Sequence, residues 1–337
     1  QPAESARPVG QAPAAPERPP EIAPLTEAPG VLTPKDVWVI EPSLQYAYSS
    51  SDRIALVGYT VIPAILIGLI DVRTIRANTL VGTMTFRRGI TNRFEVEARV
   101  PYVYRWDNTQ GREVFTGAST DNFFIDQDGQ GIGDVEVTGR YQINDGDGTS
   151  PYYIASLRFK TRTGKDPFEV KTAFTVDGAR TSGVQQELPT GSGFYSITPG
   201  LTVLIPSDPA VFFGGISYQY SFARDNVSVN AVDVPPGFAD YKHIRPGGIW
   251  GFNFGMGLAL NERSSFSLGY EQLAVGQTNA TFANGTRVPG TTIQLGTLLL
   301  GYSYKVDAKR TLNMSVGVGV TDDSPDIQLT VRMPFTL

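Results

Sequence analysis

The chain ends in Asp-Ile-Gln-Leu-Thr-Val-Arg-Met-Pro-Phe-Thr-Leu, DIQLTVRMPFTL, residues 326–337. Every odd position from Ile327 to Leu337 is apolar, and every even position from Gln328 to Thr336 is polar or proline. A period of two is typical of a strand with one apolar and one polar face. Chain termini are usually frayed and polar. This pattern therefore predicts a last strand that is held in a sheet.

Composition excludes several classes of protein. The 337 residues carry a net charge of −5, which leaves no basic footprint for nucleic acid. The mean hydropathy of −0.13 is far too low for a helical membrane protein. The chain has no Cys and a single His, so neither a disulfide framework nor a thiolate or multi-histidine metal site is available. We expect no cofactor and no metal.

Segments with a period of two recur from residue 37 to the last residue. They are residues 37–48, 78–88, 93–105, 131–143, 151–163, 193–205, 210–223, 247–260, 265–277, 291–304, 310–321 and 326–337. Most are longer than a usual strand of a globular protein, which has about five or six residues. They match the roughly 9–11 residues of a strand that spans a bilayer. The sequence thus predicts about twelve strands, an even number within the range of outer-membrane barrels.

The connections between these segments alternate in length. Short, turn-like links are residues 89–92, 144–150, 206–209, 261–264 and 306–309, whereas long links are residues 49–77, 106–130, 164–192, 224–246 and 278–290. Only residues 322–325 break the pattern on the long side. Short turns at one rim and long loops at the other are typical of outer-membrane β-barrels, in which the short turns are periplasmic.

The two faces of each segment agree with a membrane barrel. In residues 311–320, Leu312, Met314, Val316, Val318 and Val320 alternate with polar or small residues. We expect the first set to face lipid and the second to face the lumen, with tyrosines at the strand ends near the membrane interfaces. The prediction is an all-β, transmembrane antiparallel barrel over residues 37–337 in the bacterial outer membrane. Its last strand would pair with its first, because a closed barrel leaves no edge.

Two features fit this prediction less well. Pro42, Pro101, Pro199 and Pro334 each remove a ladder hydrogen bond. Residues 54–70 carry no charge and approach the length of a membrane-spanning helix, although Pro63 and two glycines argue against one. The conformation of residues 54–70 stays open between strand, loop and subunit contact.

Residues 1–36 form a separate region. They contain nine of the 24 prolines and no aromatic residue, so they cannot build a core. A flexible tail is one interpretation, and a plug that enters the lumen is the other. Pro24 suits the first position of a short helix that ends before Pro29-Gly30. The residues predicted to form the plug are Pro20, Glu21, Ile22, Leu25, Glu27 and Leu32.

Charged residues gather on the faces that we assign to the lumen of three segments. They are Glu95, Glu97, Arg99, Asp134, Glu136, Arg140, Arg158, Lys160 and Arg162. They form either a structural lattice of ion pairs or a patch for selectivity or plug docking, and the two roles are compatible. A barrel of this strand number has a backbone diameter of roughly 24 Å. Side chains leave about 10–14 Å, enough for an extended polypeptide but not for a folded domain.

Catalytic and metal sites find little support. Asp126, Asp128 and Asp134 hint at calcium, but Val137 stands where a calcium loop needs Glu, so a Gly-Asp turn is favoured. His243 would need an Asp or Ser partner to act as a base, and the sequence specifies none. We predict that the protein is not an enzyme.

Four stretches carry a resemblance to a known family. RPPEIAPLTEAPGVLTP (18–34), PSLQYAYSSSDRIALVGYTVIPAILIGLIDVR (42–73), TNRFEVEARVPYVYR (91–105) and GIGDVEV (131–137) are similar to FapF. These outer-membrane channels export functional-amyloid subunits in pseudomonads. The first three stretches are fairly specific, whereas GIGDVEV is shared with other envelope barrels. The resemblance runs from about residue 18 to the last residue.

The resemblance implies a trimer of twelve-stranded barrels, a helical plug at Pro19–Pro34 and a periplasmic coiled coil, although no heptad run is present in the chain. The function expected is secretion of unfolded amyloid subunits, important in biofilms, through a gated pore. The partners expected are these subunits, two further copies of the chain and outer-membrane lipid with lipopolysaccharide. The alternative is an importer of small hydrophobic or aromatic compounds, which predicts a hydrophobic pocket and a lateral opening.

Overall fold

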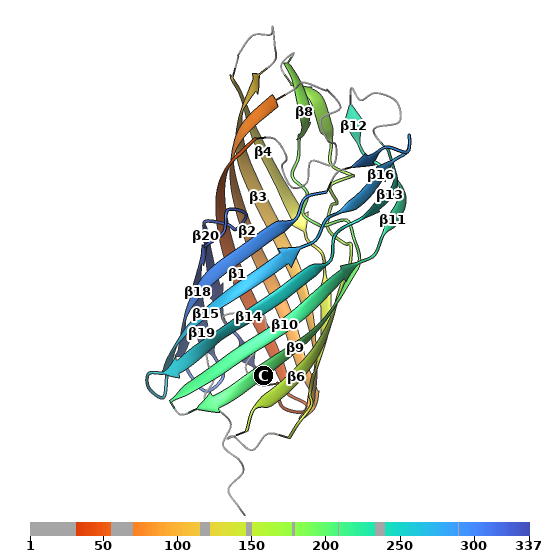
Figure 1. Ribbon diagram of the computed structural model, residues 1–337. Helices are drawn as coiled ribbons and strands as arrows, with labels where there is room; N and C mark the ends of the chain where they lie inside the picture. The colour runs from red at the N-terminus through yellow and green to blue at the C-terminus, as the bar shows by residue number, and fades with distance from the viewer. Residues whose placement is uncertain are drawn as a thin grey trace, which may run out of the picture.

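A computed structural model describes residues 32–54, 70–114, 122–145, 150–176, 179–207, 209–232, 240–288 and 290–337. Within these ranges all regular structure is β, as the sequence predicts (Figure 1). The described residues contain no helix that is long and apolar enough to cross a membrane. Residues 55–69 and the proposed helix after Pro24 lie outside the described residues.

The main sheet is a closed antiparallel barrel of 12 strands. In order they are β1 (Trp38–Ile54), β2 (Ile70–Thr91), β3 (Phe94–Val114), β4 (Asn122–Ile132) with β5 (Glu136–Gln142), β6 (Tyr152–Lys160), β9 (Ser196–Ser207), β10 (Ala210–Ser221), β14 (Ile249–Ala259), β15 (Ser264–Val275), β18 (Ile293–Lys305), β19 (Thr311–Gly319), and β20 (Ile327–Arg332) with β21 (Phe335–Thr336). The last strand closes the barrel on β1: Leu44 pairs with Val331, and Ile40 with Phe335. The terminal strand is therefore held, as its pattern predicts.

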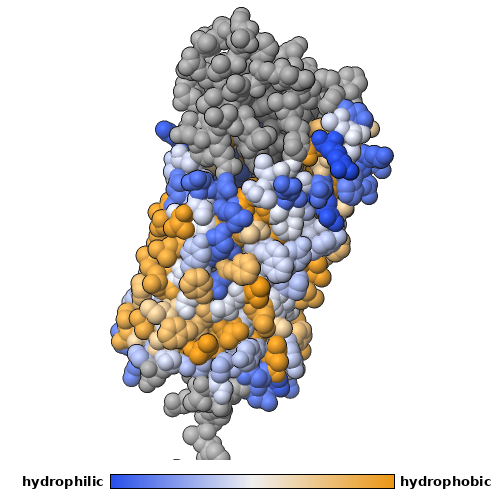
Figure 2. Space-filling model, in the orientation of Figure 1, coloured by the Kyte–Doolittle hydropathy of each residue, from blue (hydrophilic) through white to orange (hydrophobic). Residues whose placement is uncertain are grey.

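The facing of the strands follows the period of two. On β14, Trp250, Phe252 and Phe254 are exposed on the outer face, whereas Asn253 lines the interior. Figure 2 shows hydrophobic side chains gathered over the lower part of the barrel, with hydrophilic ones above them. This outer band is what lipid requires, because apolar side chains must face hydrocarbon there.

Two of the predicted barrel strands are each interrupted in the structure. Residues 131–143 divide into β4 and β5, with Gly133–Val135 outside either strand. β4 pairs with the upper part of β3, while β5 pairs with both β3 and β6. The last strand is also divided, because Pro334 cannot donate a ladder hydrogen bond. Pro42, Pro101 and Pro199 lie within β1, β3 and β9.

The long connections contain strands that sequence periodicity did not predict. β11 (Arg224–Ser228), β13 (Asp240–Arg245), β16 (Asn279–Phe282) and β17 (Arg287–Val288) form one sheet. β7 (Thr172–Val176), β8 (Ala179–Gln185) and β12 (Ala231–Val232) form another. Figure 1 places both sheets at the end of the barrel opposite the short turns. We call these two sheets, together with the loop residues that pack against them, the outer cap.

The outer cap has a hydrophobic core of its own. It consists of Phe168, Phe194, Val227, Val229, Tyr241, Ile244, Ala280 and Phe282, with Val288 packed against it. Tyr241 and Phe282 are each 1% exposed, and their ring centroids lie 4.9 Å apart. The strands of the outer cap are only two to seven residues long. They are too short to show a clear period, and long-range contacts between loops stabilise them instead.

Candidate functional site

The barrel encloses a cavity of about 370 Å³, which is the candidate conduction path. Its lining includes Ser43, Gln45, Thr83, Glu97, Arg99, Thr138, Arg140, Ser156, Arg158, Asn253, Glu271, Ser315, Gln328, Thr330 and Arg332. These side chains are polar because they lie at the inward positions of strands whose outward positions face lipid. The path suits a hydrated or hydrogen-bonding solute better than a hydrocarbon.

A group of buried ion pairs lies on one side of the lumen. The Arg140 guanidinium is 3.0 Å from both Glu95 Oε1 and Glu97 Oε2. Arg87 Nε is 3.0 Å from Glu97 Oε2, and the Arg87 guanidinium is 3.7 Å from Glu41. Glu95 is fully buried and Glu97 is 2% exposed. Charges so far removed from bulk water persist only because each has a partner.

This arrangement comes directly from strand register. Glu95 is opposite Arg140 in the β3–β5 pair, and Arg87 is opposite Glu97 in the β2–β3 pair. Cross-strand partners on one face lie about 5 Å apart, so opposite charges at these positions meet. Two arginines thus serve three carboxylates, those of Glu41, Glu95 and Glu97.

Glu136 connects two further arginines towards the outer end. Its Oε2 is 3.6 Å from Arg99 Nη1 and 3.8 Å from Arg158 Nη1. Both arginines line the cavity and keep part of their surface exposed. Two guanidinium groups thus line the lumen around one carboxylate in this part of the lattice.

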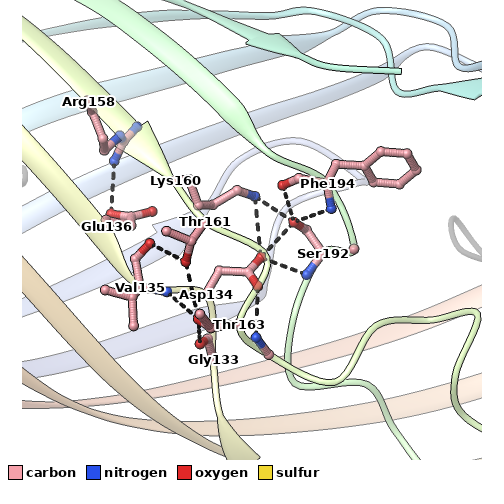
Figure 3. Close-up of polar contacts among 12 residues, drawn as sticks. Gly133, Asp134, Val135, Glu136, Arg158, Lys160, Thr161, Thr163, Ser192 and Phe194 are labelled. Carbon is pink, nitrogen blue, oxygen red and sulfur yellow. Dashed lines mark hydrogen bonds and ion pairs between the residues drawn. The ribbon is translucent and has the colours of Figure 1, made fainter. Parts of the chain in front are cut away.

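Asp134 organises the interruption between β4 and β5 (Figure 3). Its carboxylate accepts hydrogen bonds from the backbone and hydroxyl of Ser192 at 2.8 and 2.6 Å and from the Gly164 backbone at 3.2 Å. Lys160 Nζ is 3.8 Å from Asp134 and donates to Ser192 Oγ at 2.8 Å. Asp134 therefore joins the wall to the chain that leads into the outer cap.

Hydroxyl groups take the place of the missing ladder bonds at the same point. Thr161 donates to the Val135 carbonyl and Thr163 to the Gly133 carbonyl, each at 2.8 Å (Figure 3). Further out, Thr190 Oγ1 donates to the Ile132 carbonyl at 3.0 Å. The backbone of the interruption is thus satisfied by side chains, as buried polar groups require.

The N-terminal segment meets the lumen wall next to the buried ion pairs. The Thr33 amide donates to Glu95 Oε2 at 2.7 Å. Leu32, which is 3% exposed, packs with Tyr152, Ile154 and Leu204. We call Leu32–Asp36 the anchor. The Thr33 amide of the anchor supplies a hydrogen-bond donor to Glu95, one of the three carboxylates that share two arginines.

The close approach of the anchor depends on Gly89. A Cβ at Gly89 would lie 2.5 Å from the Thr33 carbonyl oxygen and closer still to that of Pro34. The Asp36 amide donates to the Gly89 carbonyl at 2.8 Å. Glycine is therefore needed at the end of β2, because any side chain would push the anchor away.

The remaining predicted residues divide into two groups. Pro20, Glu21, Ile22, Leu25 and Glu27 lie outside the described residues. Arg162 lies beyond the end of β6 and is exposed, with its guanidinium 5.6 Å from the ring centroid of Tyr195. The structure brings the other predicted charges into the lumen wall and places Arg162 apart from them. The physical reason is that the ladder of β6 ends at Lys160.

Sequence reasoning missed three charged residues of the lumen, Arg87, Glu271 and Arg332. Arg87 completes the buried ion pairs, and Glu271 and Arg332 line the cavity. Strand parity would have found Arg87, because it shares a face with Thr83 and Thr85 on β2. Glu271 and Arg332 each follow neutral residues on the inward face of their strand, so the search for clusters of charge along the sequence passed over them.

His243 lies on the outer cap, far along the chain from the lumen charges. Its Nδ1 is 2.6 Å from Asp225 Oδ1, and both side chains are well exposed. The pair joins neighbouring strands, since His243 and Asp225 are register partners in β13 and β11. In the described chain no three His, Asp or Glu side chains come together as metal ligands.

Solved structures of other proteins are similar to this chain. An outer-membrane channel from Pseudomonas putida F1 matches with a TM-score of 0.56 and 11% identity, over 91% of this chain and 98% of that chain. The translocator domain of the autotransporter NalP from Neisseria meningitidis matches with a TM-score of 0.46, 8% identity and coverage of 90% and 88%. The P. putida toluene transporter TodX matches with a TM-score of 0.40, 11% identity and coverage of 89% and 90%.

No family model matches the chain. The likeness to the P. putida F1 channel, together with the closed barrel and its apolar outer band, shows the fold of a bacterial outer-membrane β-barrel. At this level of identity the likeness concerns the fold, and the transported molecule has to be inferred from the site itself.

Proposed function

We propose that this outer-membrane channel secretes unfolded functional-amyloid subunits through a lumen that its N-terminal segment plugs and gates. The observation that carries the proposal is the anchor, in which Thr33 and Leu32 dock on the lumen wall. The chain that precedes Leu32 must therefore start from a point inside the barrel mouth. A tail attached there has an effective concentration in the lumen of about millimolar, so weak contacts suffice to hold it.

The lining of the cavity supports a polypeptide cargo. An unfolded chain presents a backbone amide and carbonyl at every residue, and hydroxyl, amide and charged side chains can exchange hydrogen bonds with them. Asn253, Gln328 and Thr330 offer such groups to the lumen. The expected inner width of about 10–14 Å passes an extended chain and excludes a folded one.

Single-channel conductance tests the gate. The protein is compared in planar bilayers with a variant that lacks residues 1–31 but keeps the anchor. We expect the shortened protein to be open for most of the recording, whereas the full chain is mostly closed. Equal conductance and equal open probability would show that residues 1–31 are a tail.

A cross-link separates the anchor from the plug. The chain has no Cys, so Leu32→Cys with Leu204→Cys introduces a single possible disulfide between residues of one hydrophobic cluster. We expect the oxidised protein to gate as the reduced protein does, because the moving part lies N-terminal to the anchor. Gating that stops on oxidation would place the movement in the anchor itself.

An importer of small hydrophobic or aromatic compounds is the second candidate. One observation favours it: β4 bonds to β3 but not to β6, so the wall beside β4 is completed by loop residues. Displacing residues 188–192 would open that wall to the bilayer. The polar lining of the cavity argues against this function, since a hydrocarbon gains nothing from it.

Two transport assays decide between the candidates. Cells that carry the channel are tested for uptake of radiolabelled toluene, and bilayer recordings are tested for transient blockade by an unfolded amyloid-subunit polypeptide on the periplasmic side. Secretion predicts blockade without faster uptake. Uptake without blockade would overturn the secretion proposal.

The secretion proposal includes assembly as a homotrimer. The outer face of the barrel supplies apolar and aromatic surface for subunit contacts, as on β14. Mild cross-linking in native membranes followed by electrophoresis tests this part. A product at the mass of one chain alone, at every cross-linker concentration, would contradict it.

A further inference from the structure

An aromatic surface covers the outer ends of three neighbouring barrel strands. Phe159 of β6 stacks on Tyr195 before β9, with ring centroids 6.0 Å apart. Tyr220 of β10 meets Phe222 edge to face at 5.4 Å. The Phe222 amide donates to the Tyr195 carbonyl at 2.9 Å, so the two ring pairs lie on adjacent segments of the chain. All four rings are exposed on the outside of the barrel.

Strand geometry places this aromatic surface at the outer membrane interface. Phe212 begins the lipid-facing row of β10, and Phe222 ends it. A rise of about 3.3 Å per residue and a tilt of about 40° separate these two residues by roughly 25 Å along the membrane normal. That distance equals the usual apolar band of an outer-membrane barrel, and the long-loop end faces the cell exterior.

Two arginines flank the aromatic surface. The Arg162 guanidinium lies 5.6 Å from the Tyr195 ring centroid, and the Arg245 guanidinium lies 6.0 Å from that of Tyr220. Both side chains are exposed, and neither has an ion pair with a carboxylate of the described chain. An aromatic face holds a guanidinium in place without neutralising its charge. Both groups therefore remain able to bind an anion.

Arg224 of the outer cap is an arginine with a structural role. Its guanidinium also lies over rings, at 5.0 Å from Phe168, but its Nη1 is 2.7 Å from the buried carboxylate of Asp166. That charge is compensated inside the protein. Arg162 and Arg245 share the aromatic support and lack the carboxylate, so their charge is directed to something outside the described chain.

We propose that Arg162 and Arg245, with the aromatic surface between them, bind the phosphorylated glucosamine headgroup of lipopolysaccharide in the outer leaflet. The headgroup carries phosphates at both ends of a disaccharide, and arginine is the side chain best suited to phosphate. Sugars stack on aromatic faces, while the acyl chains lie on the apolar rows below, which include Leu201 and Ile216. Charge complementarity and the position at the outer interface both favour this occupant.

Lipid binding to the purified full chain in detergent tests the proposal. Bis-phosphorylated lipid A is titrated against the protein, and binding is followed by native mass spectrometry. We expect the Arg162→Gln/Arg245→Gln variant to bind at least tenfold more weakly than the unchanged protein. Lipid A with both phosphates removed should bind the two proteins equally, because the lost interaction is with phosphate.

Arg88→Gln is the matched control. The Arg88 guanidinium also lies over an exposed ring, 5.1 Å from the centroid of Trp38, but it pairs with Asp36 at 3.7 Å and lies at the periplasmic rim, where lipopolysaccharide is absent. We expect it to bind lipid A as the unchanged protein does, and a heat-dependent shift in electrophoretic mobility confirms that each variant is folded. Unchanged binding by the double variant would overturn the proposal. Equal displacement of lipid A by phosphatidylglycerol would also overturn it, since the site would then select charge alone.

Discussion

The barrel and the outer cap bury opposite kinds of residue. Inside the barrel the most buried side chains include Glu95, Glu97 and Ser267, while Phe254 on the outside is 62% exposed. In the outer cap, Phe282 and Tyr241 are buried and Asp225 is exposed. The difference lies in the solvent: lipid covers the barrel and water covers the outer cap, and each region turns matching side chains outward. One chain thus contains an inverted and an ordinary hydrophobic pattern.

The largest effect is expected in the inverted interior. Arg140→Met removes the main partner of Glu95 and Glu97 and leaves two buried carboxylates poorly compensated. We expect it to lower the free energy of unfolding by about 3–5 kcal/mol, measured by denaturant titration in lipid vesicles. Adding Glu95→Gln and Glu97→Gln should restore most of the loss. A single variant that stays fully stable would show that water already compensates these charges.

The ordinary core of the outer cap predicts a local effect of similar size. Phe282→Ala removes a ring that is 1% exposed and should cost about 3–5 kcal/mol of local stability. Hydrogen exchange should then accelerate in β11, β13 and β16 while the barrel stays protected. Phe254→Ala, the same truncation on the lipid face, should leave exchange in the outer cap unchanged. Loss of protection throughout the barrel would show that the two regions unfold together.

Neighbouring residues on β19 test the inversion itself. Val316→Lys places a charge on the lipid face and should cost about 2–4 kcal/mol near mid-membrane. Ser315→Lys points into the cavity and should cost much less. The two variants are compared by the same titration in vesicles. Equal costs would contradict the assignment of faces.

The smallest effect concerns Tyr241. Its hydroxyl is buried without a hydrogen-bond partner in the described chain, and burial raises the pKa of the phenol well above its ordinary value of 10.0. Tyr241→Phe should therefore be neutral or stabilise the outer cap by about 1 kcal/mol. Because the unfolded phenol ionises first, the unchanged protein should lose outer-cap stability above about pH 10, and the variant should lose less. Hydrogen exchange of the outer cap, measured for both proteins from about pH 8 to about pH 11, compares their loss of stability. Identical pH profiles for the two proteins would contradict the prediction.

The sequence by itself determined the barrel. A period of two that continues to Leu337, short turns that alternate with long links, and charges confined to one face together require a closed sheet in a membrane. Residues such as Glu95 and Arg140 were recognisable as lumen charges for the same reason. Strand periodicity is a local property, so it can be recognised in the sequence without knowing what the strands contact.

Only the tertiary structure decided the rest. The break at Gly133–Val135 exists because Asp134 and nearby hydroxyls bond to loops distant in sequence. The outer cap forms because short strands from separate long loops share one hydrophobic core, and no single loop has enough periodicity to reveal it. The docking of Leu32 and the exposure of Arg162 likewise depend on where a strand ends relative to its neighbours. Such contacts are set by register and three-dimensional distance, which no local pattern of residues contains.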